Sequence, residues 1–219
     1  MPRDGLRRRI EVVGWLVCLT AGSAHAADLV QRDLLLEVEA EPSEFSWSVD
    51  RDGTTLSGSD EFSRHAALVV GGRYSFASAG SSVGLLVGVD GVLGRADQTG
   101  AATLYWVEGR AAVGLAWAIT RDLSFSALAR GGLGLDRFDT PGTESYAGFQ
   151  ASGGHLSVTP EVALGWRPGS TWRWSLHAGW RWSKAALVGD HATMTIDQSG
   201  PMLGLSLTML LSDVPPALE

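Results

Sequence analysis

The stretch LYWVEGRAAVGLAWAITRDLSFSALARGGLGLDRF, residues 104–138, decides the fold. A short polar turn at 120–122 divides it into two runs, and in each run two kinds of side chain alternate. Residues of one parity are bulky and apolar: Tyr105, Val107, Val113, Leu115, Trp117, Leu123, Phe125, Leu133 and Leu135. Most residues of the other parity are small or charged, among them Glu108, Arg110, Ser124 and Arg130. This period of two predicts β-strands, because successive side chains of a strand point to opposite faces.

The composition of the two faces predicts a membrane barrel. A soluble sheet buries its bulky apolar face and covers the other face with charges, whereas in an outer-membrane barrel the apolar face meets lipid and the narrow lumen takes small and polar groups. A soluble lipocalin-like barrel would carry its charges outside. It is disfavoured because the charges here share their parity with small residues.

Length, charge and cysteine content restrict the possible functions. The 219 residues fit one domain, and the formal charge is −7. Nucleic-acid binding is excluded as a role, because phosphate contacts need clustered lysine and arginine. The single cysteine, Cys18, lies in a segment that we expect to be removed, so we expect no disulfide and no cysteine metal site in the mature chain.

The chain is predicted to divide into four segments. Residues 1–26 have the features of a secretory signal peptide, with arginines at the start, an apolar run at 10–19 and the small-x-small sequence Ala24-His25-Ala26. We expect residues 27–42 to be a periplasmic lead-in segment, 43–211 an outer-membrane barrel and 212–219 a periplasmic tail. The predicted location is therefore the Gram-negative outer membrane, after removal of the signal peptide.

The fold class predicted is all-β, an eight-stranded antiparallel up-and-down barrel. The strands are expected near residues 43–51, 64–77, 82–96, 104–119, 123–138, 154–167, 171–185 and 201–211. Pro160 is expected to mark a bulge in its strand. Long and short connections alternate, which is typical of barrels with short periplasmic turns and longer external loops. The external loops are expected near 51–63, 97–102, 139–153 and 187–200.

This pattern resembles the small eight-stranded outer-membrane barrels of the OmpA/OmpX type. The resemblance covers about residues 43–211 and depends on strand pattern, not on a fingerprint motif. It implies contact with outer-membrane lipid and lipopolysaccharide, handling by the barrel-assembly machinery and a possible protein partner at the external loops. It implies no cofactor.

Charged residues of the inward parity predict a polar network in the lumen. An eight-stranded barrel is just wide enough for side chains to fill, and buried charges need partners. The predicted network consists of Arg73, Asp90, Glu108, Arg110, Arg130, Asp136, Glu161, Arg173, His177 and Arg181. We expect it to plug the lumen, and a narrow ion path along the same residues is the alternative.

No catalytic or metal site is predicted. The lipid A deacylase family carries a His-x-Ser pair on its seventh strand and a Glu on its eighth, but the histidine position here is Arg181, and residues 200–205 hold no carboxylate. His155 and Ser157 have the i, i+2 spacing of such a pair, yet Glu161 lies about 20 Å from His155 at ~3.3 Å per residue. His177 with Glu161 is expected to be a lumen hydrogen bond. His191 beside Asp190 offers too few ligands for a metal.

The sequence therefore predicts a non-enzymatic barrel that acts as a structural or surface-interaction protein through its external loops. An outer-leaflet lipid-modifying enzyme and a narrow ion-conducting barrel stay open as alternatives.

Overall fold

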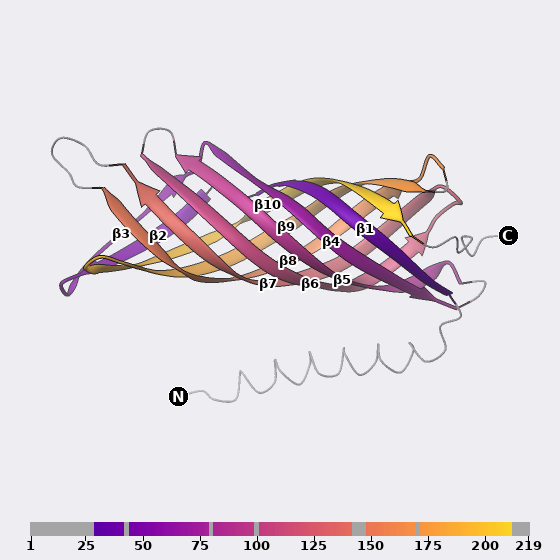
Figure 1. Ribbon diagram of the computed structural model, residues 1–219, viewed down its shortest axis with the longest axis horizontal. Helices are drawn as coiled ribbons and strands as arrows, with labels where there is room; N and C mark the ends of the chain where they lie inside the picture. Colours follow the sequence, from indigo (N-terminus) through magenta and orange to yellow (C-terminus); the bar gives the residue numbers. More distant parts are fainter. Residues whose placement is uncertain are drawn as a thin grey trace, which may run out of the picture.

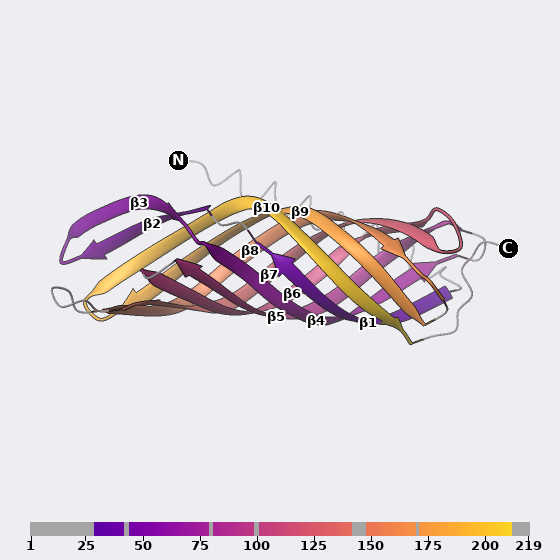
Figure 2. The ribbon, with the colours of Figure 1, turned by 90° about the horizontal axis from the view of Figure 1, so that it is seen from above.

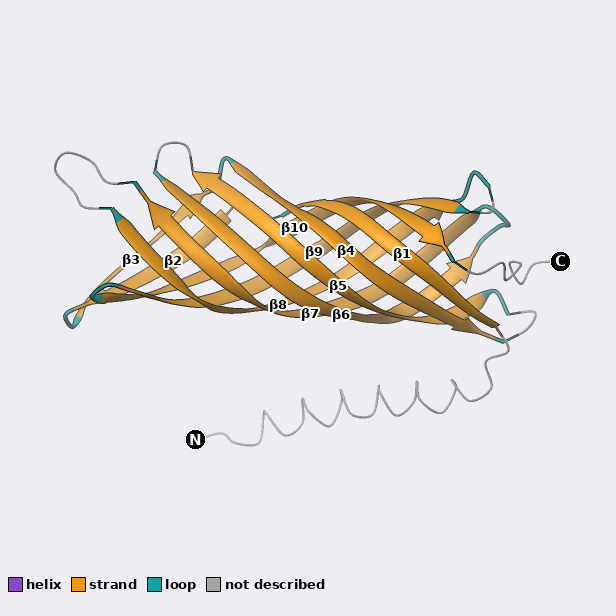
Figure 3. Cartoon of the chain, in the orientation of Figure 1, coloured by secondary structure: helices purple, strands orange, loops and turns teal. Residues whose placement is uncertain are grey.

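The computed structural model describes residues 29–41, 44–78, 81–98, 101–141, 148–169 and 171–211. Within these residues the chain forms ten strands and no helix long and apolar enough to cross a membrane (Figure 3). The strands are β1 (Leu29–Ala40), β2 (Glu44–Arg51), β3 (Thr54–Glu61), β4 (Arg64–Ala77), β5 (Val83–Gln98), β6 (Ala102–Ala118), β7 (Leu123–Thr140), β8 (Phe149–Trp166), β9 (Trp172–Gly189) and β10 (Ala192–Leu210).

Eight of these strands close into a ring. β1 pairs with β4, the strands from β4 to β10 pair antiparallel in chain order, and β10 pairs back onto β1 (Figure 1). The closing pair runs from Asp33 opposite Leu210 to Ala40 opposite Leu203. A closed ring leaves no strand edge unpaired, which is the condition for a sheet to lie in lipid. The predicted fold, an eight-stranded antiparallel barrel, is confirmed.

The predicted first strand is wrong. The ring position belongs to β1, whereas residues 44–51 form β2, which pairs with β10 farther along, at residues 193–198. Residues 27–42 are therefore not a lead-in segment, since most of them lie in the barrel wall. The reason is that the glutamates of this stretch point inward, where the lumen arginines compensate them, while Leu34 and Leu36 point outward. The predicted signal peptide, 1–26, and the predicted tail, 212–219, lie outside the described residues.

The predicted loop at 51–63 contains a strand. β2 and β3 form a hairpin whose turn residues Asp52 and Gly53 have φ values of 52° and 79°. Positive φ at both central positions is the type I′ turn, for which Asp-Gly is a favoured sequence. Figures 1 and 2 place this hairpin at one end of the barrel, which we call the loop end. The β4–β5, β6–β7 and β8–β9 connections lie at the opposite end, which we call the turn end.

The strands reach farther at the loop end than the sequence pattern predicts. The predicted loops at 139–153 and 187–200 contain the connections but are too long, because β8 begins at Phe149 and only Asp190 and His191 separate β9 from β10. In this region large apolar side chains take the inner face: Leu187 and Ile196 are buried inside, while the outer face carries polar residues such as Ser152 beside Val188, which is 65% exposed. A strand with a polar outer face lacks the signal of a lipid-facing strand, so it resembles a loop in the sequence.

The inward apolar side chains fill the loop end of the lumen with an apolar plug. The plug consists of buried side chains from the barrel strands and from the β2–β3 hairpin and its exit: Phe45, Phe62, Ala67, Val69, Val92, Ala96, Ala102, Leu104, Trp106, Phe138, Ala151, Ala185, Leu187, Met194 and Ile196. The rings of Phe45 and Phe62 stack with centroids 4.2 Å apart. Gly94 makes room for the Trp106 indole, because a Cβ at that position would overlap the ring.

Below the plug, the outer wall carries the apolar belt. Its exposed side chains include Val38, Val70, Val89, Val107, Val113, Leu133, Leu156, Leu164, Leu176 and Leu205. Trp166, Trp172 and Trp174 lie at the turn end of this surface, and Tyr105 and Trp182 lie toward the loop end, as in aromatic girdles. The predicted sidedness is confirmed, because the large apolar side chains face outward while Arg110 and Arg130 are 3% and 1% exposed.

Pro160 interrupts the β8–β9 ladder without a bulge. Val158 pairs with Trp182 and Glu161 with Gly179, so the register is the same on both sides of the two unpaired residues. The predicted bulge is therefore wrong. A missing N–H removes a ladder hydrogen bond without requiring an inserted residue.

Val89→Arg is expected to lower the free energy of unfolding by about 2–4 kcal/mol, the cost of arginine at the middle of the lipid face of a barrel. Val89 is 66% exposed and lies midway along the outer face of β5, between Val83 and Arg95. The measurement is denaturant unfolding of the protein refolded in phospholipid vesicles, followed by tryptophan fluorescence. Ser152→Arg, on the exposed wall beyond the belt, is the control and is expected to cost about 0–1 kcal/mol. Equal costs at the two positions would contradict the assignment of the belt.

Candidate functional site: the charged lumen

Inward side chains below the plug form a buried network of charges. Following β1 from the turn end, Asp33, Glu37, Glu39 and Glu41 project into the lumen at successive levels. All ten residues predicted for the network take part in ion pairs: Arg73, Asp90, Glu108, Arg110, Arg130, Asp136, Glu161, Arg173, His177 and Arg181. The structure thus brings together residues from β1 and from β4 to β9.

Arg130 is the centre of the network. Its Nη1 donates to Glu39 Oε1 at 2.6 Å, and its Nη2 donates to Glu37 Oε2 and Glu161 Oε1, both at 2.8 Å. All four side chains are fully buried. Arg110 adds a two-pronged contact to Glu39, at 3.0 and 3.1 Å. Charge-assisted hydrogen bonds of this kind offset the cost of taking ions out of water.

His177 links this centre to the closing strand. Its Nδ1 lies 3.1 Å from Glu161 Oε1, and its Nε2 lies 2.8 Å from Ser206 Oγ on β10. The predicted hydrogen bond between His177 and Glu161 is present, and both ring nitrogens have a partner.

A second cluster lies between the centre and the plug. Arg181 donates to Glu41 at 3.0 Å and to Glu108 at 2.8 Å. His155 contacts Asp136 through Nδ1, and Ser157 donates to Glu108. Gly132 is required beside this cluster, because a Cβ there would overlap the Glu108 carboxylate.

The geometry of this cluster does not form a nucleophile. In a serine hydrolase the serine hydroxyl bonds to the histidine, which acts as base. Here the Ser157 hydroxyl bonds to Glu108, and His155 Nε2 lies 3.6 Å from the same carboxylate. Glu161 bonds to Arg130 and His177 instead. Among the described residues, no group of three or more His, Cys, Asp or Glu side chains has the arrangement of a metal site.

The carboxylates of β1 were not part of the predicted network. Residues 27–42 are assigned to a lead-in segment from the sequence, although Glu37, Glu39 and Glu41 alternate there with apolar residues. The charge balance was a second signal, because the predicted network held five arginines and only four carboxylates. In the described lumen, eight buried carboxylates accompany those arginines and three histidines.

Comparison with solved structures identifies the fold class. OprG of Pseudomonas aeruginosa, an outer-membrane protein, superposes with a TM-score of 0.50 at 8% identity, over 84% of this chain and 97% of that one. Ail of Yersinia pestis matches at 15% identity and a TM-score of 0.38, over 80% and 97%. Neisserial surface protein A matches at 13% identity and a TM-score of 0.38, over 80% and 96%.

The protein thus has the fold of a small outer-membrane β-barrel, with a ring of eight strands. At these identities the similarity shows the fold and not a role. The sequence matches no protein-family model and no curated protein.

Arg130→Met is expected to lower the free energy of unfolding by about 3–5 kcal/mol, because it leaves buried carboxylates without their counter-charge. The measurement is the same denaturant unfolding in vesicles. Adding Glu37→Gln should recover part of this loss, since it removes one of the carboxylates that Arg130 contacts at 2.8 Å.

The matched control is Arg137→Met. Arg137 forms an exposed pair with Asp139 at 2.9 Å, and such surface pairs contribute about 0.2–1 kcal/mol. Similar losses for the Arg130 and Arg137 variants would contradict the central place of Arg130.

Proposed function

We propose that the protein is a closed, non-conducting and non-enzymatic barrel of the outer membrane that interacts with a partner through its exposed β2–β3 hairpin. The observation that carries this proposal is the contrast between the two parts of the molecule. The lumen is filled at two levels, by the ion network and by the apolar plug, whereas the hairpin lies beyond the belt with all eight residues of β3 exposed.

The filled lumen favours a closed barrel over a narrow channel. The interior of an eight-stranded barrel is just wide enough for side chains to fill. At the plug, Phe62 stacks on Phe45, and His65 packs edge-on against Trp106 with centroids 4.9 Å apart. Below it, Arg130 spans the lumen. A continuous water path would require both levels to open.

The lumen residues also favour a role other than catalysis. Ser157 and His155 are 4% and 6% exposed and lie beneath the plug, so a lipid substrate has no access to them from the loop end. Their hydrogen bonds go to carboxylates and not to each other. These contacts serve the stability of the wall.

The hairpin has the properties of an interaction surface. In the sheet order β3 is terminal, with β2 as its neighbour. The hairpin, residues 44–61, carries five acids, Glu44, Asp50, Asp52, Asp60 and Glu61, and one arginine, Arg51. Charge complementarity steers association, so this surface favours a basic partner.

The same proposal gives the location and orientation. With residues 1–26 removed as a signal peptide, the barrel would reach the outer membrane through the barrel-assembly machinery. Its turn end would face the periplasm and its loop end the exterior, in contact with lipopolysaccharide. The long excursion between β1 and β4 at the loop end, which contains the β2–β3 hairpin, supports this orientation.

No conductance steps are expected when the purified protein is added to a planar lipid bilayer, because the plug and the ion network both obstruct the lumen. A porin added to the same bilayer is the positive control. Discrete steps from the wild-type barrel would overturn the closed-lumen part of the proposal.

Neutralising the hairpin is expected to reduce binding of a basic probe. The variant combines Glu44→Gln, Asp50→Asn, Asp52→Asn and Glu61→Gln, all at exposed positions. Cells that display the protein are titrated with fluorescent polylysine, and the wild type should bind more probe, with a difference that shrinks as salt rises.

Asp122→Asn, in the β6–β7 turn at the opposite end of the barrel, is the control and should leave binding unchanged. Heat-modifiable migration on a gel verifies that each variant is folded. Equal probe binding by the hairpin variant and the wild type would contradict the proposal.

A further inference from the structure

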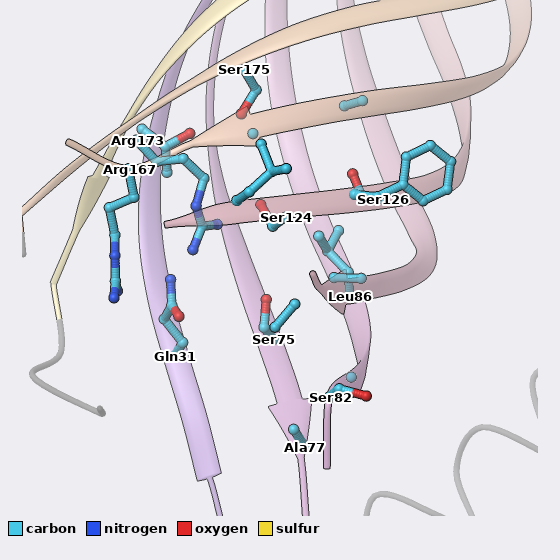
Figure 4. Close-up of a pocket in the computed structure, with 18 of the residues that line it drawn as sticks. Gln31, Ser75, Ala77, Ser82, Leu86, Ser124, Ser126, Arg167, Arg173 and Ser175 are labelled. Atoms are coloured by element: carbon cyan, nitrogen blue, oxygen red, sulfur yellow. The ribbon is translucent and has the colours of Figure 1, made fainter. Parts of the chain in front are cut away.

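We infer that the turn end of the lumen holds a binding site for a small phosphate-type oxyanion. A cavity of about 160 Å³ opens there, below the central ion network, and inward residues of β1, β4, β7 and β9 contribute to its lining. Figure 4 shows Arg173 beside Ser124 and Ser175 across this space, with Ser75 on the facing strand. This site goes beyond the proposed function, since it lies at the end opposite to the hairpin.

The cavity carries a surplus of positive charge. Four arginines line it, Arg73, Arg121, Arg167 and Arg173, against two carboxylates, Asp33 and Asp122. The rest of the lumen has the opposite balance, with more carboxylates than arginines. An anion at the turn end would therefore meet a positive potential that ends where the acidic network begins.

One of these guanidinium groups, that of Arg73, has buried donors without a hydrogen-bond partner. Arg73 is 7% exposed, and its Nε and Nη2 make no hydrogen bond within the described residues. Its nearest carboxylate, Glu37, lies 3.7 Å away and is already bonded to Arg130 at 2.8 Å. Arg173 Nη1 lies 3.6 Å from Asp33, beyond a direct hydrogen bond. The buried Arg73 donors gain from an acceptor that enters the cavity, and the Arg173 side chain, which is 23% exposed, adds a positive charge beside them.

Hydroxyl groups complete the lining. Ser75, Ser124, Ser126, Ser175 and Thr208 all border the cavity. Their positions converge with Arg173 near Gly165: a Cβ on that glycine would lie 2.6 Å from Ser124 Oγ, 3.1 Å from Arg173 Cδ and 3.2 Å from Ser175 Oγ. Hydroxyls can donate to several oxygens of one anion while the guanidinium fork supplies the charge.

The shape of the site sets the class of ligand. The plug and the ion network seal the cavity on the loop side, so a ligand enters from the turn end. The donors surround a compact space, which suits a tetrahedral oxyanion better than an extended chain. Free phosphate and the phosphate of a lipid headgroup share this chemistry.

The test is isothermal titration of the folded protein with inorganic phosphate, in zwitterionic detergent and with ionic strength held constant by chloride. The wild type is expected to bind phosphate, and Arg173→Gln should weaken binding by about tenfold or more, as for a lost hydrogen bond to a charged group. Gly165→Ala should also weaken binding, because its methyl group would occupy the convergence point. Arg137→Gln, on the exposed wall at the loop end, should bind as the wild type does.

Two further arms complete the experiment. Arg173→Lys keeps the charge without the fork and should bind with intermediate affinity, so the proposal stays testable if Arg173→Gln does not fold. Nanodiscs containing phosphatidylglycerol are then compared with zwitterionic nanodiscs: competition with phosphate identifies a headgroup as the occupant, and equal affinity identifies the free anion. Two results would overturn the site and leave a cavity filled by water only. One is absence of phosphate binding to the wild type, and the other is wild-type affinity for phosphate in both the Arg173→Gln and the Gly165→Ala variants.

Discussion

The contact between Arg130 and the glutamates of β1 constrains the whole molecule. β7 and β1 stand on opposite sides of the ring, with three strands between them in either direction. Arg130 nevertheless bonds directly to Glu37 and Glu39. The contact therefore crosses the lumen, and the distance between the two walls is set by an arginine and a glutamate side chain placed end to end. Small inward residues such as Gly132 follow from this constraint, because they leave room for the charged groups.

This contact places paired, buried charges at the centre of the lumen. It also explains why an acidic strand is acceptable in a membrane barrel. Glu37 and Glu39 would be prohibitively costly in lipid or in an uncharged core, but inside the ring they meet Arg130, Arg110 and Arg73. The outward residues of the same strand, such as Leu36, belong to the belt. The same strand thus places apolar side chains on the lipid-facing surface and charged side chains in the lumen.

The sequence predicts the barrel well at the level of the apolar belt, and poorly at the loop end and in β1. Along residues 104–138 the bulky parity meets lipid and the charged parity meets the lumen, so a period of two is sufficient to assign both faces. At the loop end the wall leaves the belt, and Leu187 and Ile196 turn inward to form the plug. The pattern there is that of a strand in a soluble protein. Because the prediction of a membrane strand requires a bulky apolar outer face, these strand ends are assigned to loops from the sequence.

The same reasoning explains which lumen residues the sequence predicts and which it does not. Arg130 and Glu161 lie within strands whose other face is plainly apolar, so their inward direction is readable from their neighbours. Glu37 and Glu39 lie in a stretch rich in acids, and only the arginines of distant strands reveal that these carboxylates are buried. The alternation of these glutamates with apolar residues indicates a strand, but the place of that strand in the ring is three-dimensional information.

The position of β1 has a consequence for the order of assembly. Because the first ring strand pairs with the last, the seam cannot form before β10 exists. β2 pairs with β10 in the same register as β1 does, so the β2–β3 hairpin extends that seam toward the loop end. The ion pairs of Arg130 with Glu37 and Glu39 likewise form only when β1 lies opposite β7 across the lumen. Closure of the ring and desolvation of the charges thus depend on the same strand pairing, and a partly built sheet would expose both the strand edges and the charges.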